Sequence, residues 1–196
     1  MWVEGYGDLP GHLVVVSGPS GSGKSTLLRR ALQDPRVKAR LSVSATTRPP
    51  RPGEREGIDY YFMDPDEFAA ARARGEFLEC AEFNQHWYGT PARPVFEAMK
   101  AGDCVVLEIE VKGALQVREK APSALFVFID VPRFSELERR LRARGTESEA
   151  ALHRRLVRAR WELEHSTWYD VRIVNDDLDQ AVACLVHILA EYGHGE

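Results

Sequence analysis

The glycine-rich segment at residues 18–25 constrains this chain more than any other part of its sequence. The segment is GPSGSGKS, which matches the pattern GxxxxGK[ST]. An apolar, β-branched run, HLVVVS at residues 12–17, precedes it and is typical of a buried strand, and the helix-forming sequence STLLRRALQ follows. In this setting glycines let backbone N–H groups surround a phosphate, and the helix start adds the positive end of its dipole. The segment therefore predicts a phosphate-binding loop for a nucleoside triphosphate.

Two side chains of this loop have predicted chemical roles. Lys24 can reach the β- and γ-phosphates, and the Ser25 hydroxyl can be a ligand of Mg²⁺. The predicted ATP-binding residues of the loop are Gly18, Pro19, Ser20, Gly21, Ser22, Gly23, Lys24, Ser25 and Thr26. The motif indicates the donor nucleotide but identifies neither the reaction nor the second substrate.

Further apolar runs alternate with helix-forming segments. The runs are CVVLEIE at 104–110, ALFVFIDV at 124–131 and VRIVN at 171–175. The predicted helices cover residues 94–101, 133–144, 147–165 and the amphipathic stretch 178–189. Continuous apolar strands between helices favour an α/β fold with a parallel sheet covered on both faces.

Composition and charge exclude several classes of protein. With 26 Lys and Arg against 30 Asp and Glu, the net charge is −4, which argues against nucleic-acid binding through overall charge. The apolar runs are too short to span a membrane, and residues 1–11, an irregular leader, lack the pattern of a signal peptide. Cys80, Cys104 and Cys184 are widely separated, which fits a reducing compartment. We expect a cytoplasmic protein with no membrane or nucleic-acid partner, and we make no prediction of its oligomeric state.

Two stretches break the alternation of strands and helices. Residues 42–90 are rich in Thr, Arg, Pro, Gly and aromatic residues, and contain the short strand-like pieces SVSATT, YYFM and FLECAEF. We interpret them as a small lobe inserted after the first helix. Residues 133–160 hold nine Arg against four Glu, a local excess of positive charge in an acidic protein.

Several separated motifs give the chain its resemblance to a known family. In order they are the phosphate loop, SVSATTRPPRPGE, GIDYYF, GEFLECAEF, WYGT, EIEVKG, RARGTESE and IVNDD. With these motifs the chain resembles the guanylate kinases of bacterial type from about residue 12 to 190. The resemblance implies a P-loop NTPase-type sheet, a mixed α/β GMP-binding lobe and a helical lid. It also implies Mg²⁺-dependent transfer of the ATP γ-phosphate to GMP, and to dGMP, giving ADP and GDP in purine metabolism. The expected core is 12–43, 91–132 and 166–196, with the lobe at 44–90 and the lid at 133–165.

The inserted lobe carries groups suited to a nucleotide phosphate. Arg48 and Arg51 can fork onto phosphate oxygens, and the hydroxyls of Tyr60 and Tyr88 can donate to the same oxygens. The resemblance assigns these four residues to the phosphate of GMP. Taken singly, surface arginines and core tyrosines are the alternative interpretations.

Glu79 is the predicted reader of the base. Guanine presents N1–H and N2–H₂ as adjacent donors to an acceptor-only carboxylate, whereas adenine has no matching pair. The resemblance assigns Glu79 to guanine, together with Ser44 and Thr90. An ordinary strand carboxylate is the alternative for Glu79 alone.

Glu108 and Glu110 alternate at the end of a predicted strand, so both point towards one edge of the sheet, where ligands of open α/β sheets bind. They can order Mg²⁺ waters, or hold ribose hydroxyls and nearby arginines. The family usually carries Asp at both positions, so which glutamate approaches the metal and which the nucleotide stays open. A solvated strand end is the alternative.

The basic region supplies cations for the transferring phosphate. The resemblance assigns Arg144 and Arg155 to this clamp, beside Lys24, and Asn175 to the adenine side of ATP. We interpret five other arginines of the region as solvated charges: Arg139, Arg140, Arg142, Arg158 and Arg160.

Two other functions remain open. Some guanylate kinase-like domains bind phosphopeptides without catalysis, but the intact Lys24-Ser25 pair with Arg144 and Arg155 argues against that function here. A related P-loop kinase could act on another acceptor. Glu79→Gln distinguishes this second alternative, because it should weaken GMP selectively only if guanine is the base that is read.

Overall fold

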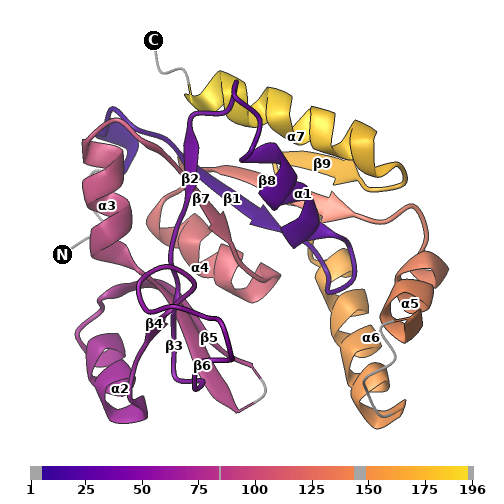
Figure 1. Ribbon diagram of the computed structural model, residues 1–196, viewed down its shortest axis with the longest axis horizontal. Helices are drawn as coiled ribbons and strands as arrows, with labels where there is room; N and C mark the ends of the chain where they lie inside the picture. The colour runs from indigo at the N-terminus through magenta and orange to yellow at the C-terminus, as the bar shows by residue number, and fades with distance from the viewer. Residues whose placement is uncertain (1–5, 84, 144–148, 194–196) are drawn as a thin grey trace.

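The strand before the phosphate loop lies at the centre of a parallel sheet (Figure 1). The computed structural model describes residues 6–83, 85–143 and 149–193, and within them this sheet has five strands in the order β2-β7-β1-β8-β9. The strands are β1 (Leu13–Ser17), β2 (Ala39–Leu41), β7 (Cys104–Glu108), β8 (Leu125–Asp130) and β9 (Val171–Val174). Every residue of β1 is buried, as expected where both faces of a parallel sheet are covered.

Helices cover both faces of this sheet. On one face Val14 and Val16 of β1 pack with α1 (Lys24–Ala31) and α7 (Leu178–Gly193). On the other, Leu13 and Val15 pack with α3 (Ala92–Lys100) and α4 (Val111–Lys120). The side chains alternate between the faces because successive residues of a strand point in opposite directions. The predicted fold class is confirmed.

The inserted lobe has a mixed sheet and a core of its own. The order of its strands is β4-β3-β6-β5, and α2 (Pro65–Ala73) packs against it. The strands are β3 (Ala45–Thr46), β4 (Tyr61–Phe62), β5 (Phe77–Phe83) and β6 (His86–Pro91). The Phe68 ring of α2 stacks on Phe77 with centroids 4.4 Å apart. A second sheet with its own helix and apolar cluster therefore lies beside the main sheet.

Two helices form the arm at the lower right of Figure 1, α5 (Phe134–Ala143) and α6 (Glu149–Glu164). They share a small apolar cluster that includes Leu137, Leu141, Leu152 and Ala159. Their bounds agree closely with the predicted helices at 133–144 and 147–165. The proposed clamp residue Arg144 lies outside the described residues.

Some elements differ from the prediction. Helices α2 and α4 and strands β2 and β6 were not predicted as such. The strand expected over 104–110 ends at Glu108, and Glu110 is the extended N-cap residue of α4. Part of the predicted leader is ordered: Tyr6 lies in the short 3-10 helix η1 (Tyr6–Asp8) and is buried edge-on against Phe96. These elements are short, so they depend on tertiary contacts more than on their own periodicity.

Among the described helices, none combines the length and the apolar character that a membrane crossing requires.

Candidate active site

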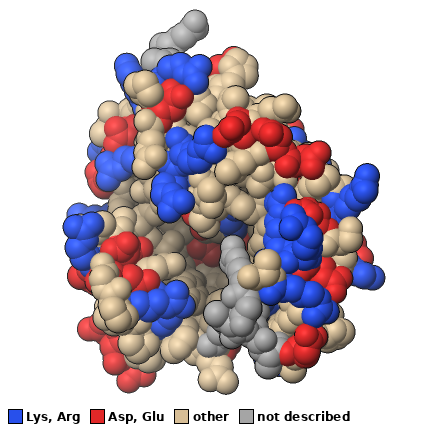
Figure 2. Space-filling view, turned by 45° about the vertical axis from the view of Figure 1, so that its right-hand side comes forward, with Lys and Arg blue, Asp and Glu red and all other residues tan. Residues whose placement is uncertain are grey.

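Two adjoining pockets open beside the carboxyl ends of the central strands. The larger, of about 440 Å³, lies between the inserted lobe and the main sheet, and the smaller, of about 180 Å³, is formed around the phosphate loop. Four side chains line both pockets: Lys24, Ser25, Glu108 and Glu110. Figure 2 shows the hollowed face, with lysine and arginine side chains on both sides of the hollow and acidic atoms in its depth. Ligands in the two pockets would meet at these four side chains.

The phosphate loop is held from behind by Asn175. The Asn175 amide is buried and donates a 2.6 Å hydrogen bond to the Ser22 carbonyl. Gly23 has a φ of 88°, and a Cβ at that position would lie 2.4 Å from the same amide nitrogen. Only glycine fits this approach and this backbone conformation without strain. Asn175, predicted to contact adenine, thus contacts the loop itself.

Lys24 and Ser25 lie where the two pockets join. Within the part of the chain that the structure describes, the Lys24 ammonium makes two long contacts, 3.4 Å to the Gly18 carbonyl and 3.5 Å to the Ile109 carbonyl. Ser25 donates through Oγ to Glu108 Oε1 at 2.5 Å. The ammonium is weakly held and can turn to a phosphate, while the serine hydroxyl is already oriented by a carboxylate.

One face of α6 lies towards the phosphate loop. Arg155 donates to Ser20 Oγ of the loop, and Glu162, two turns further along the helix, lines the smaller pocket. Glu162 is 3% exposed; burial first, then the nearby Glu110 carboxylate, raises its pKa to about 7. Sequence analysis missed Glu162, although its seven-residue spacing from Arg155 was a usable signal.

The base-reading residues meet across two strands of the inserted lobe. Glu79 of β5 is directly opposite Thr90 of β6, whose hydroxyl donates to Glu79 Oε1 at 2.8 Å. Glu79 is 6% exposed and lines the larger pocket. Burial raises the pKa of Glu79 to about 7, against the opposing effect of the Thr90 hydrogen bonds. Ser44 lines the same pocket, so the three predicted base contacts are brought together.

Gly113 of α4 brings the helix backbone close to Glu79. A Cβ at this glycine would lie 2.6 Å from Glu79 Oε2 and 3.1 Å from Cδ. Sequence analysis missed Gly113 because it missed the helix. Because Gly113 has no side chain, the Glu79 carboxylate can occupy its position beside the pocket without a steric clash.

Replacing Gly113 with alanine should raise the KM for GMP about tenfold or more, because the new methyl group displaces a buried carboxylate that has little room to move. The KM for ATP should change less than twofold, and the melting temperature should not fall much, since alanine favours a helix. Steady-state kinetics with each substrate varied in turn measures both constants. The control is Ala73→Gly, which also changes a helix residue by one methyl group but at a position of α2 that lines neither pocket. Gly75→Ala is unsuitable as a control, because Gly75 has a positive φ that strains an alanine. An unchanged KM for GMP would contradict the steric argument.

A carboxylate that sequence analysis did not assign orders the proposed phosphate-binding arginines. Glu54 accepts from Arg48 Nη2 through both oxygens, at 2.8 and 3.0 Å, and from the Arg51 backbone N–H at 2.7 Å. The Arg48 guanidinium also lies 5.5 Å from the centre of the Tyr60 ring. The four residues predicted to bind the GMP phosphate all line the larger pocket: Arg48, Arg51, Tyr60 and Tyr88. Glu54 is the last residue of the motif SVSATTRPPRPGE, which contributes to the family resemblance, but the sequence alone did not indicate a function for Glu54.

The remaining predicted arginines differ in their surroundings. Arg139 and Arg142 are exposed and pair with glutamates of their own helix, which is common on a solvent-facing helix surface. Arg140 also pairs with Glu136 of its own helix, and in addition it donates to the Asn175 carbonyl at 3.1 Å. Arg158 contacts Glu110 and Phe83. Arg140 and Arg158 are partly exposed, and each has a contact outside its own helix that the interpretation as solvated charges does not include.

A phosphate loop at the end of a parallel sheet, adjoining a second pocket with arginines and a buried carboxylate, defines a P-loop kinase of small phosphorylated acceptors. The family model described as guanylate kinase matches residues 11–192. The chain belongs to the guanylate kinase family, and it is an ATP:GMP phosphotransferase.

Individual relatives agree with this assignment. A guanylate kinase of Thermosynechococcus vestitus is 51% identical over 176 residues, which cover 90% of this chain and 92% of the relative. One of Frankia casuarinae is 51% identical over 181 residues, covering 92% and 98%. The crystal structure of guanylate kinase from Anaplasma phagocytophilum superimposes with a TM-score of 0.72 at 32% identity, covering 94% of this chain and 87% of that one.

Proposed function

We propose that the two pockets separate the two substrates of the family reaction, with ATP on the phosphate loop and GMP in the larger pocket. The observation that carries this division is the junction: Lys24, Ser25, Glu108 and Glu110 line both pockets. A phosphate held by each pocket would face the other there, which is what a direct transfer between nucleotides requires.

The larger pocket has the chemistry to select GMP. Glu79, an acceptor-only group when ionised, takes the two adjacent donors of guanine, with Thr90 and Ser44 beside it. Arg48 and Arg51 take the phosphate with the Tyr60 and Tyr88 hydroxyls. The Arg48–Glu54 contact fixes the guanidinium before GMP arrives, so less side-chain entropy is lost on binding.

The donor side fits Mg²⁺. Ser25, Glu108 and Glu110 offer the oxygen ligands that Mg²⁺ prefers. Mg²⁺ in nucleotide sites is usually bound by one or two side chains together with phosphates and water. We assign Ser25 as a ligand, with Glu108 or Glu110 acting through water. The ion would neutralise charge on the phosphate oxygens.

In the transfer itself the protein supplies position and charge. A GMP phosphate oxygen attacks the γ-phosphorus of ATP in line, and ADP leaves as GDP forms. Lys24 and Arg155, with Arg144, neutralise the oxygens of the transferring group, and Asn175 supports the loop under ATP. We assign residues 133–165 to a lid that excludes water, which would otherwise accept the phosphate. We assign residues 12–43, 91–132 and 166–196 to the core and residues 44–90 to the GMP-binding lobe.

We place this reaction in the cytoplasm, without a nucleic-acid partner. Cys80, Cys104 and Cys184 are free thiols, as a reducing compartment favours, and the net charge is −4.

A coupled assay of ADP production tests the proposal. With Mg²⁺ and ATP, GMP and dGMP should be phosphorylated, while AMP, CMP and UMP should react at least a hundredfold more slowly. Removing Mg²⁺ with a chelator should abolish turnover. A folded protein that binds ATP but phosphorylates none of these acceptors would contradict the proposal. Calorimetry would then show whether it binds a phosphopeptide instead.

A further inference from the structure

Arg158 of α6 contacts Glu110, a side chain that lines both pockets. It lies on the same face of the helix as Arg155 and Glu162, three residues after the first and four before the second. Its side chain is 38% exposed, so it is neither buried in a core nor free in solvent.

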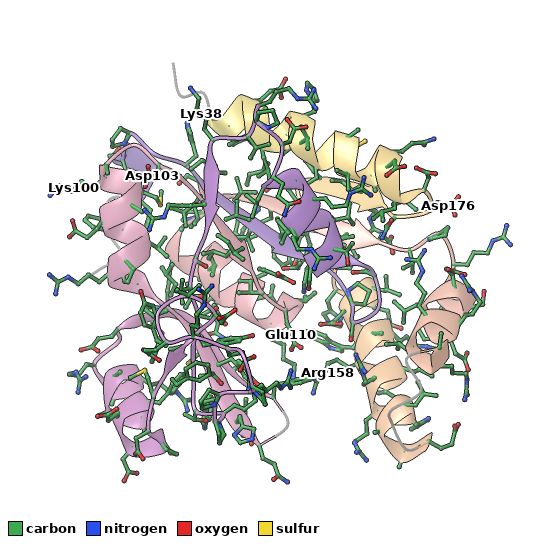
Figure 3. All side chains as sticks on the ribbon, viewed as in Figure 1. Lys38, Lys100, Asp103, Glu110, Arg158 and Asp176 are labelled. Atoms are coloured by element: carbon green, nitrogen blue, oxygen red, sulfur yellow. The ribbon has the colours of Figure 1, made fainter. Side chains whose placement is uncertain are left out.

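The contacts of Arg158 join three parts of the molecule. Its Nη1 lies 3.5 Å from Glu110 Oε1 at the start of α4, and its guanidinium carbon lies 4.6 Å from the centre of the Phe83 ring at the end of β5. Figure 3 shows Arg158 and Glu110 close together between the main sheet and α6. One side chain of the arm thus contacts both the core and the inserted lobe.

These contacts add little to the stability of the fold. Both partners of the ion pair are more than one third exposed, and such pairs contribute less than about 1 kcal/mol. A cation–π contact at an exposed site adds a similar amount. We therefore look for the role of this ion pair in its location beside the two pockets, since it contributes little to the free energy of unfolding.

Glu110 needs a partner to fix its carboxylate. It lines both pockets, and although it is the N-cap residue of α4 its side chain makes no capping hydrogen bond. A glutamate side chain has three rotatable bonds, so without a partner its carboxylate occupies many positions. Arg158 supplies such a partner, with its Nη1 3.5 Å from Glu110 Oε1.

We propose that Arg158 is a positioning residue for phosphoryl transfer: from the lid helix it holds the Glu110 carboxylate at the junction of the ATP and GMP pockets. The inference rests on the proposed function and adds a residue to its machinery. Arg158 itself lines neither pocket, so its effect is on the transfer step more than on the affinity for either nucleotide.

Arg158→Gln should lower kcat about tenfold, with the KM for GMP changed less than threefold and the melting temperature within about 2 °C of wild type. Arg160→Gln is the matched control, because Arg160 is on the same helix and its guanidinium carbon lies 5.0 Å from the centre of the Phe134 ring. Both changes remove one positive charge and one aromatic contact from α6. Arg160→Gln should leave kcat unchanged. Arg158→Lys keeps the charge and should restore part of the lost rate.

A double-mutant cycle tests whether Arg158 acts through Glu110. Glu110→Asp shortens the side chain by one methylene and withdraws its carboxylate from a cation already 3.5 Å away. In this background Arg158→Gln should cost less than twofold in kcat.

Three results would overturn the inference: equal kcat for Arg158→Gln and Arg160→Gln, a loss confined to KM, or a tenfold loss that persists in Glu110→Asp. A wild-type protein that does not phosphorylate GMP would overturn the proposed function and the inference together. An active wild type with any of the three results would overturn the inference alone.

Discussion

Replacing Lys24 with alanine should lower kcat by about a thousandfold or more while the protein stays folded. A loss of this size corresponds to about 4 kcal/mol of transition-state stabilisation, as when a positioned donor is removed from developing negative charge. Lys24 lines both pockets, at the point where the two phosphates would meet. Its contacts of 3.4 and 3.5 Å to backbone carbonyls are too long to contribute much to folding.

The measurement is steady-state turnover of ATP and GMP, beside a thermal unfolding curve. Lys100→Ala is the matched control, because Lys100 is an exposed lysine of α3 far from Glu110 in Figure 3. It should have wild-type kcat. A near-normal kcat for Lys24→Ala would show that Lys24 does not stabilise the transition state of phosphoryl transfer.

Glu79→Gln should lower kcat/KM for GMP by about a hundredfold to a thousandfold. The amide keeps the shape of the carboxylate but loses its charge and can place an N–H group opposite the donors of guanine. An unpaired buried donor costs several kcal/mol, which a site built for hydrogen bonding cannot recover. Discrimination between GMP and AMP should shrink accordingly.

The control for this change is Glu82→Gln, an exposed glutamate of the same strand. It should leave the kinetics with both acceptors unchanged. If Glu79→Gln kept wild-type selectivity for GMP over AMP, Glu79 would not be the base reader.

The same substitution should make the ligand-free fold more stable at neutral and higher pH. Burial raises the pKa of Glu79 to about 7 from an ordinary value of 4.5, so the folded state holds its proton at pH values where the unfolded chain has lost it. The folded state is therefore penalised progressively as pH rises from about 4.5 to 7, and the full penalty applies above 7. Removing this charge should stabilise the protein by about 1–3 kcal/mol at pH 8 and by little at pH 4.5.

Unfolding curves of wild type and Glu79→Gln between pH 5 and 9 measure this difference. GMP should also bind more tightly as pH rises through about 7, because guanine favours the ionised carboxylate, and binding below that pH should release a proton. Calorimetry in two buffers of different ionisation enthalpy detects the proton. A wild-type stability that does not fall relative to Glu79→Gln would show that burial does not penalise this carboxylate.

Local sequence patterns determined much of the fold and part of the site. Residues 18–25 define the phosphate loop by themselves, because the loop is formed by consecutive residues between a strand and a helix. The apolar runs similarly predicted β1, β7, β8 and β9, since a strand buried on both faces needs apolar residues at every position. The order of the motifs indicated the family, and the resemblance assigned Glu79 and Arg48 to GMP. Both residues line the larger pocket.

The tertiary structure alone decided which side chains meet from distant segments. Gly113 touches Glu79 only because α4 packs against β5, and the apolar pattern of this short helix is too weak to predict it. Arg158 resembles the solvated arginines beside it until α6 is placed next to Glu110 and Phe83. Periodicity reports which face of an element is apolar, but a polar contact between elements depends on their packing, which no local pattern contains.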